Sequence, residues 1–96
     1  MRVIWSYIAA GNLIENSRYI ARENPEAARS VISDIYEAGN RIKEFPGKGR
    51  IVPEIGKANV KEIFCRSYRI IYKVEAKRIT ILTVRHMRQQ LEPEAI

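Results

Sequence analysis

The pattern of apolar and polar positions along the chain predicts a strand, two helices and three further strands. Met1–Trp5 (MRVIW) is short, apolar and β-branched, which is typical of a strand. Ser6 could then cap a helix, since its hydroxyl can accept a free backbone N–H at the helix start. This first helix is predicted from Tyr7 to about Glu23, with one apolar face made of Ala10, Leu13, Ile14, Ile20 and Ala21.

The dipeptide Asn24-Pro25 marks the boundary between the two helices. Proline disfavours a helical residue before it but suits the first position of a new helix, with Asn24 as its N-cap. The second helix is predicted to end before Pro46, and its apolar residues recur at three- and four-residue steps: Ala28, Val31, Ile32, Ile35, Ala38, Gly39 and Ile42. A tight turn between the helices makes them an antiparallel hairpin. Residues 46–59 (PGKGRIVPEIGKAN) are predicted to form a connecting loop, because glycine and proline interrupt regular structure.

Three strands are predicted between Val60 and Arg88. Tyr68–Val74 and Ile79–Val84 are rich in Ile, Tyr, Val and Thr, and the polar residues 75–77 between them suit a hairpin loop. The whole order predicts an α+β fold: an N-terminal strand, an antiparallel helix hairpin, then a three-stranded antiparallel meander, all strands forming one largely antiparallel sheet. We expect the helices on one sheet face and solvent or a partner on the other. Residues 1–92 form the single predicted domain and residues 93–96 a short tail. The chain after Met87 is expected to lack a regular element and to be mobile.

The charge, the cysteine count and the hydropathy of the chain limit the kinds of partner, metal site and location that we expect. The net charge of +6 and a pI near 9.8 indicate either an anionic partner or simply a soluble basic surface. With Cys65 alone, the chain offers no internal disulfide and no cysteine-based metal site, so no metal or cofactor is expected. No apolar run is long enough to span a bilayer and no signal-peptide pattern opens the chain, so a cytoplasmic location without a membrane partner is expected.

Cations that alternate with apolar residues are the candidate functional groups. Nucleic-acid or target binding is predicted for the following residues: Lys48, Arg50, Lys61, Arg66, Lys73 and Arg85. Metal-free RNA cleavage needs proton transfer and a cation at the phosphate, roles that suit His86 together with Arg69 and Arg88. Two structural alternatives remain: His86 makes a hydrogen bond at a strand end, and Arg69 pairs across strands with Glu62 or Glu75. Tyr68 and Tyr72 share a face and serve as core or as stacking platforms for bases.

The register of the last hairpin decides whether Arg69 and His86 meet. A two-residue turn at Ala76-Lys77 places Arg69 opposite Val84 and on the face of His86. A three-residue turn places Arg69 opposite Thr83 and on the face of Arg85 instead. We favour the two-residue turn, because it is the commoner hairpin connection.

The ordered set of motifs resembles the RelE/ParE superfamily of bacterial toxins. The resemblance covers almost the whole chain and rests on the opening VIW, on ENPEAA between the helices, on EFPGKGR, and above all on VKEIFCRSYRIIYKV followed by ITILTVRHMR. It implies the toxin half of a type II toxin–antitoxin module of the plasmid-stabilisation kind. It also implies a cognate antitoxin that binds it in a hetero-oligomer.

The two branches of the superfamily imply different mechanisms. ParE-like members inhibit DNA gyrase, and the segments GRIVPE and RHMR favour this branch. RelE-like members cut mRNA at the ribosome without a metal, and in them the positions of Arg69 and of His86 or Arg88 contribute to catalysis. Many of these nucleases also carry a tyrosine or histidine in the C-terminal tail, whereas the tail QQLEPEAI has neither. An inactive basic binding domain is the third hypothesis.

Overall fold

The elements follow the predicted order, with one short strand and one short helix added. The computed structural model describes residues 1–93. Its elements are β1 (Arg2–Trp5), α1 (Tyr7–Ala21), α2 (Pro25–Asn40), the short 3-10 helix η1 (Arg41–Glu44), β2 (Arg50–Ile51), β3 (Val60–Cys65), β4 (Tyr68–Val74) and β5 (Arg78–His86). The additions are η1 at the end of α2 and β2 inside the predicted loop.

Both helices begin at the predicted caps. Ser6 Oγ accepts a hydrogen bond from the backbone N–H of Ala9, and Asn24 Oδ1 accepts one from that of Ala27, each at 3.0 Å. Pro25 occupies the first position of α2. These side chains satisfy N–H groups that have no partner inside the helix, so short polar residues define where each helix starts.

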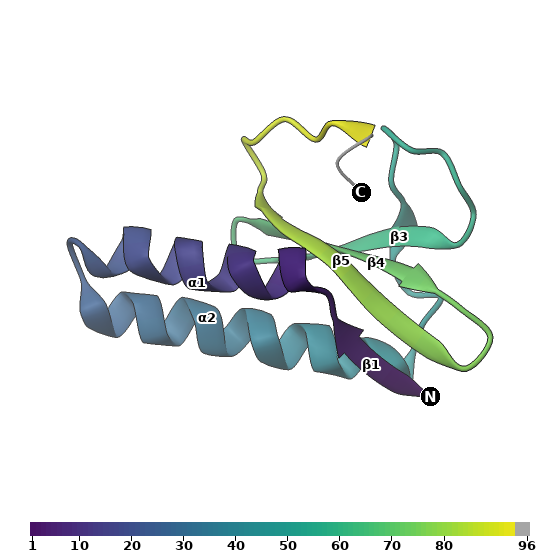
Figure 1. The fold of residues 1–96 in the computed structure, drawn as a ribbon, viewed down its shortest axis with the longest axis horizontal. Coiled ribbons are helices and arrows are strands. Elements are labelled where there is room, and N and C mark those ends of the chain that lie inside the picture. The colour runs from purple at the N-terminus through teal and green to yellow at the C-terminus, as the bar shows by residue number, and fades with distance from the viewer. Residues whose placement is uncertain (94–96) are drawn as a thin grey trace.

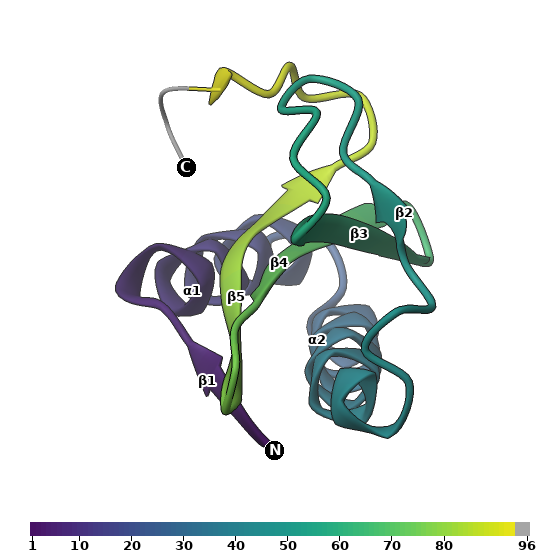
Figure 2. The same ribbon diagram turned by 90° about the vertical axis from the view of Figure 1, so that its right-hand side faces the viewer.

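The five strands form one sheet in the order β1-β5-β4-β3-β2. The parallel pair β1–β5 joins the N-terminal strand to the last strand, and the other pairs are antiparallel. Figures 1 and 2 show the helix hairpin on one face of this sheet, with α1 beside β5 and α2 beneath β3 and β4. The predicted α+β class, with helices on one face of a largely antiparallel sheet, is confirmed.

The main core lies between the helices and the sheet. Its fully buried members come from Ala9 of α1, from α2 and from alternate positions of β4 and β5, the largest being Ile35, Ile70, Tyr72, Ile79 and Ile81. The predicted apolar face of α2 and the predicted core role of the two β4 tyrosines are confirmed.

The opposite sheet face is also partly covered, contrary to the prediction of an open face. Val52 and Val60 pack with Ile71 and Leu91 in a second buried cluster. The segment before β3 and the chain after β5 come together on this side (Figure 2). Leu91 is therefore buried against the sheet, while the mobility expected for the chain after Met87 stays a prediction. For residues 94–96 that expectation lies outside the described residues.

A β-bulge changes the register of the β4–β5 hairpin. The turn has the predicted two-residue form, since Glu75 N–H donates to the Arg78 carbonyl. An extra residue, Leu82, then shifts the pairing, and Arg69 lies opposite Arg85 instead of Val84. Tyr68 lies opposite His86. The predicted pairing of Arg69 is therefore wrong by one residue.

The bulge lies where α1 replaces β1 as the neighbour of β5. Asn12 Oδ1 accepts hydrogen bonds from the Val84 N–H (2.9 Å) and the Thr83 hydroxyl (2.8 Å). The Ser6 hydroxyl donates to the Leu82 carbonyl. Side chains of the α1 segment thus satisfy backbone groups at an edge that β1 is too short to cover.

One predicted core position of α1 is not in the core. Ile14 is 53% exposed, whereas Ala9 is fully buried. Since α1 sits at the edge of the sheet, only a narrow stripe of the helix contacts the core.

Candidate functional site

Arg69 lies in a chain of ion pairs, buried at its centre and exposed at its two ends, on the sheet face away from the helices. Its Nε donates to Glu62 at 2.6 Å, and its two terminal nitrogens donate to the carboxylate of Glu54 at 2.8 and 2.9 Å. The second oxygen of Glu62 accepts from Arg50 at 2.6 Å. Two cations and two carboxylates therefore neutralise one another. The alternative pairing of Arg69 with Glu62 is confirmed, whereas Glu54 was not foreseen.

Burial makes this chain of charges a structural element. The side chains of Arg69 and Glu62 are 8% and 0% exposed, respectively. Hydrogen bonds from Arg69 lower the pKa of Glu54 to about 2, and the same bonds raise the pKa of Arg69 above its ordinary value. Both groups therefore stay charged across the physiological range. With its Nε and both terminal nitrogens bonded to carboxylates, Arg69 is poorly placed to clamp a phosphate.

His86 and Arg88 lie on the other side of the sheet from Arg69. The ring of His86 meets the Tyr68 ring edge-on at 5.3 Å, and Tyr68 belongs to the helix-side core. His86 Nδ1 accepts the backbone N–H of Arg88 at 3.1 Å. With Tyr19 of α1 these side chains line a hollow of about 470 Å³. The structure thus brings His86 and Arg88 together and separates them from Arg69.

The remaining predicted cations are distributed over several surfaces. Arg66 adopts a left-handed backbone conformation (φ 53°) in the β3–β4 turn and pairs with Asp34 of α2 at 2.6 Å. Lys73 lies 3.9 Å from Glu75. Arg85 donates to the Thr83 hydroxyl, and Lys61 borders a separate hollow. Lys48 and Arg50 both border one groove.

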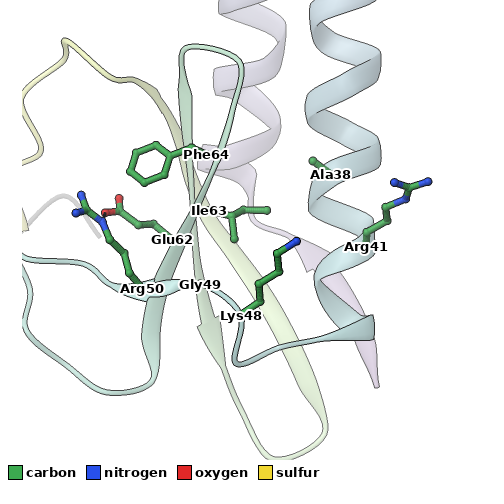
Figure 3. A pocket seen from close by; sticks show the side chains of 8 residues that line it. All are labelled: Ala38, Arg41, Lys48, Gly49, Arg50, Glu62, Ile63 and Phe64. Atoms are coloured by element: carbon green, nitrogen blue, oxygen red, sulfur yellow. Dashed lines mark hydrogen bonds and ion pairs between the residues drawn. The ribbon is translucent and has the colours of Figure 1, made fainter.

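This basic groove runs between α2 and the β3 edge (Figure 3). It has a volume of about 550 Å³ and is lined by Ala38, Arg41, Lys48, Gly49, Arg50, Glu62, Ile63 and Phe64. Three of these residues are cations: Arg50 is bonded to Glu62, Arg41 lies 4.0 Å from the exposed Glu37, and Lys48 forms no ion pair with any residue between 1 and 93. Figure 3 shows Lys48 and Ile63 pointing to the α2 side of β3, where Arg41 lies, and Arg50 and Phe64 pointing to the other side, so the groove wraps around this strand edge. Arg41 was not among the residues predicted from the sequence. The apolar pattern of the second helix does not show that the C-terminal end of this helix faces the PGKG segment.

The PGKG segment is held in place by Tyr72. The tyrosine hydroxyl donates to the Pro46 carbonyl at 2.8 Å and accepts from Gly49 N–H at 3.1 Å. A Cβ at Gly49 would lie 2.5 Å from that hydroxyl oxygen and 2.7 Å from the Glu62 carbonyl oxygen. Only glycine allows this close approach, which brings Lys48 to the groove.

The groove borders a stretch of β3 that has an open edge. β2 pairs only through Arg50 and Ile51, with Glu62 and Lys61 respectively. Within residues 1–93, the rest of β3 up to Cys65 has no second strand on that side. Phe64 is 45% exposed there and lies beneath the Arg50 guanidinium at 5.1 Å from the ring centre. An extended acidic segment would find backbone hydrogen bonds, apolar contact and cations together at this edge.

In the described part of the chain, no three His, Cys, Asp or Glu side chains lie close enough to hold a metal ion. None of the helices between residues 1 and 93 has the length and apolar character needed to cross a membrane.

Comparison with known proteins points to one family. The family model described as "ParE toxin of type II toxin-antitoxin system, parDE" matches residues 3–91. A curated relative from Sinorhizobium fredii, "Putative toxin Y4kP", is 32% identical over 90 residues, covering 93% of this chain and 91% of the relative.

Solved structures show the same fold. The chromosomal ParDE toxin–antitoxin system from P. aeruginosa matches with a TM-score of 0.74 and 22% identity, covering 90% of this chain and 95% of that chain. The RelBE2 toxin–antitoxin complex from Mycobacterium tuberculosis matches with a TM-score of 0.54 and 17% identity, covering 88% and 95%.

Proposed function

The chain belongs to the ParE toxin family of type II toxin–antitoxin systems, and from this premise we propose that it arrests growth by binding and inhibiting DNA gyrase. One observation carries the choice of a binding inhibitor over a nuclease. The sheet separates Arg69 from His86 and Arg88, the three side chains that RNA cleavage would need together.

The chemical reason is the geometry of phosphoryl transfer. Proton transfer and stabilisation of the phosphate charge must act on the same few atoms, within hydrogen-bond reach of each other. Arg69 instead neutralises two carboxylates in a chain of ion pairs, and His86 packs on a core tyrosine. An inhibitor that acts by occupying a target surface needs no such convergent set.

We further propose that the basic groove binds the cognate antitoxin. The groove places the exposed cations Arg41 and Lys48 near an open strand edge, so an acidic extended segment could add a strand beside β3. Covering of this edge by such a segment would also protect Phe64, which is exposed in the isolated toxin. The resulting complex would be the hetero-oligomer implied by the family.

Two parallel assays test the mechanism. Purified toxin is added to a gyrase supercoiling reaction, and to a ribosome-dependent translation reaction whose mRNA is mapped by primer extension. We expect supercoiling to stop and the mRNA to stay intact. Codon-related cuts in the mRNA, with supercoiling unaffected, would reject the gyrase proposal and establish the RelE-like enzyme. Failure to arrest growth on induction would support the inactive binding domain.

A charge reversal tests the groove. The double variant Arg41→Glu/Lys48→Glu is assayed for binding to the protein encoded beside the toxin. We expect at least about a tenfold loss of affinity, because like charges then face the acidic segment. Arg29→Glu on α2 and Lys77→Glu in the β4–β5 turn change exposed cations away from the groove, so they serve as matched controls. Equal affinity of the double variant and the controls would exclude the groove as the antitoxin site.

A further inference from the structure

The outward face of α1 carries more large apolar side chains than a solvent-exposed helix normally does, since only Glu15 and Arg18 of its six exposed residues are charged. Tyr7 and Tyr19 are 99% and 71% exposed, and Ile8 and Ile14 are 52% and 53% exposed. Tyr7 and Ile14 are seven residues apart and Ile8 and Tyr19 are eleven apart, so each of these pairs lies along one line of the outer helix surface, with the exposed Glu15 and Arg18 between the two lines. Exposed isoleucines and tyrosines at such positions leave a large apolar surface in water.

The neighbouring helix shows the normal pattern. The exposed positions of α2 are mainly polar or charged, for example Glu26, Arg29, Ser33 and Glu37. Its one exposed large apolar residue, Tyr36, is stacked on Trp5 with ring centres 5.4 Å apart. Two helices of one hairpin thus differ in outer character, so the apolar face is a specific property of α1.

Hollows on both sides of α1 offer places for anchoring side chains of a partner. Ile14 and Arg18 border a hollow of about 280 Å³ that reaches Ile32 of α2. Tyr19 borders the larger hollow of about 470 Å³ that contains His86 and Arg88. The apolar ridge formed by Ile14 and Tyr19 thus lies between two hollows. In protein interfaces of this shape, a few side chains buried in such hollows supply most of the binding free energy.

Charge around the ridge indicates the character of the partner. Arg18, Arg22 and Arg88 make no ion pair with any residue between 1 and 93, and Arg22 lies over the Tyr19 ring at 5.8 Å. A second copy of the chain would place these arginines against one another. A nucleic acid would meet isoleucines where it needs cations. A protein with an apolar groove flanked by carboxylates fits both features.

We propose that the outward face of α1, defined by Tyr7, Ile8, Ile14, Arg18 and Tyr19, is the surface through which the toxin docks on its target protein. This assignment rests on the proposed function as a binding inhibitor. The α1 face adjoins β5, whereas the basic groove adjoins β2 and β3 on the other side of β4. Target and antitoxin would therefore first contact different edges of the toxin.

The test uses glutamate substitutions, which keep helix propensity high while they remove apolar surface and oppose acidic partners. Ile14→Glu and Tyr19→Glu are compared with Ile51→Glu, in which a residue of similar exposure (45%) on β2 is changed in the same way. Each protein is measured for gyrase inhibition, for growth arrest on induction, for antitoxin binding and for thermal unfolding. We expect the two α1 variants to inhibit gyrase at least about tenfold more weakly, with unfolding like that of the wild type. The Ile51→Glu control should inhibit as the wild type does.

The outcomes separate this proposal from the proposed function. Wild-type toxin that arrests growth without inhibiting gyrase would reject gyrase as the target, and growth arrest alone would then report on the α1 face. Folded α1 variants that inhibit or arrest as strongly as wild type would overturn the docking proposal. So would variants that lose only antitoxin binding, or a wild-type dimer that Ile14→Glu converts to monomer while inhibition is unchanged.

Discussion

Replacing Arg69 by methionine should strongly destabilise the fold. The change leaves the fully buried carboxylate of Glu62 without the more buried of its two arginine partners. Removing one member of a buried ion pair costs about 3–5 kcal/mol of unfolding free energy. Arg50 still pairs with Glu62 at 2.6 Å, so we expect the lower end, about 3 kcal/mol. For a domain of this size that corresponds to a melting temperature lower by roughly 12–24 °C.

A second variant separates stability from toxicity. Arg69→Met/Glu62→Met removes both buried charges, and the remaining partners Arg50 and Glu54 are 58% and 34% exposed and can be solvated. Apolar replacement of a whole buried pair is often neutral or stabilising, so the double variant should unfold within about 1 kcal/mol of wild type. Urea unfolding measures both variants. A wild-type midpoint for Arg69→Met would refute the structural role.

Growth arrest by the same variants then reports on the role of Arg69 in toxicity. If the stable double variant arrests growth, Arg69 acts only through the fold, as its burial indicates. If the double variant is stable but harmless, the Arg69 side chain takes part directly in toxicity, and the argument from its ion pairs is refuted.

Three smaller changes test other parts of the structure. Gly49→Ala should lower the unfolding free energy by about 1–3 kcal/mol in urea, because its methyl would lie 2.5 Å from a buried tyrosine oxygen, whereas Gly47→Ala meets nothing within 4 Å and should be near neutral. Asn12→Ala should cost about 1–3 kcal/mol and speed hydrogen exchange at the β5 edge, since a buried N–H loses its acceptor; unchanged exchange would contradict this. The folded-state pKa of Glu54 lies near 2, below its ordinary 4.5, so its stabilising effect is complete above pH 4.5 and is lost as the pH falls through about 2. Glu54→Gln should flatten the stability profile in this window, and an unchanged profile would show that the carboxylate pairs elsewhere.

The fold was predictable from sequence because its signals are local. Asn24-Pro25 defines a helix start by capping chemistry, and the alternation in Tyr68–Val74 defines two strand faces regardless of what covers them. The hairpin turn was also predictable, since the short break Glu75-Ala76-Lys77 separates two β-branched runs and suits a two-residue turn. Even the pairing of Arg69 with Glu62 was among the alternatives, as opposite charges on adjacent strands commonly pair.

The arrangement of the candidate site depended on contacts between distant segments. The bulge at Leu82 occurs where Asn12, some 70 residues away, bonds to the edge of β5. One inserted residue reverses the face of every later side chain, so it placed His86 on the helix side and Arg85 beside Arg69. Arg41 became part of the groove only because Tyr72 holds the PGKG segment against β3.

The exposed Ile14 shows how a correct helix prediction can still misplace a functional surface. A three- to four-residue apolar period identifies a helix but not how much of its circumference another element will cover. Because α1 lies at the sheet edge, its core stripe is narrow, and an isoleucine that the period assigns to the core faces water. Apolar helix positions that the core does not bury add nothing to the stability of the isolated chain. Such positions are explained if a partner protein buries them. The outer face of α2 is polar although it belongs to the same hairpin and is equally exposed to solvent, which favours burial of the α1 face by a partner.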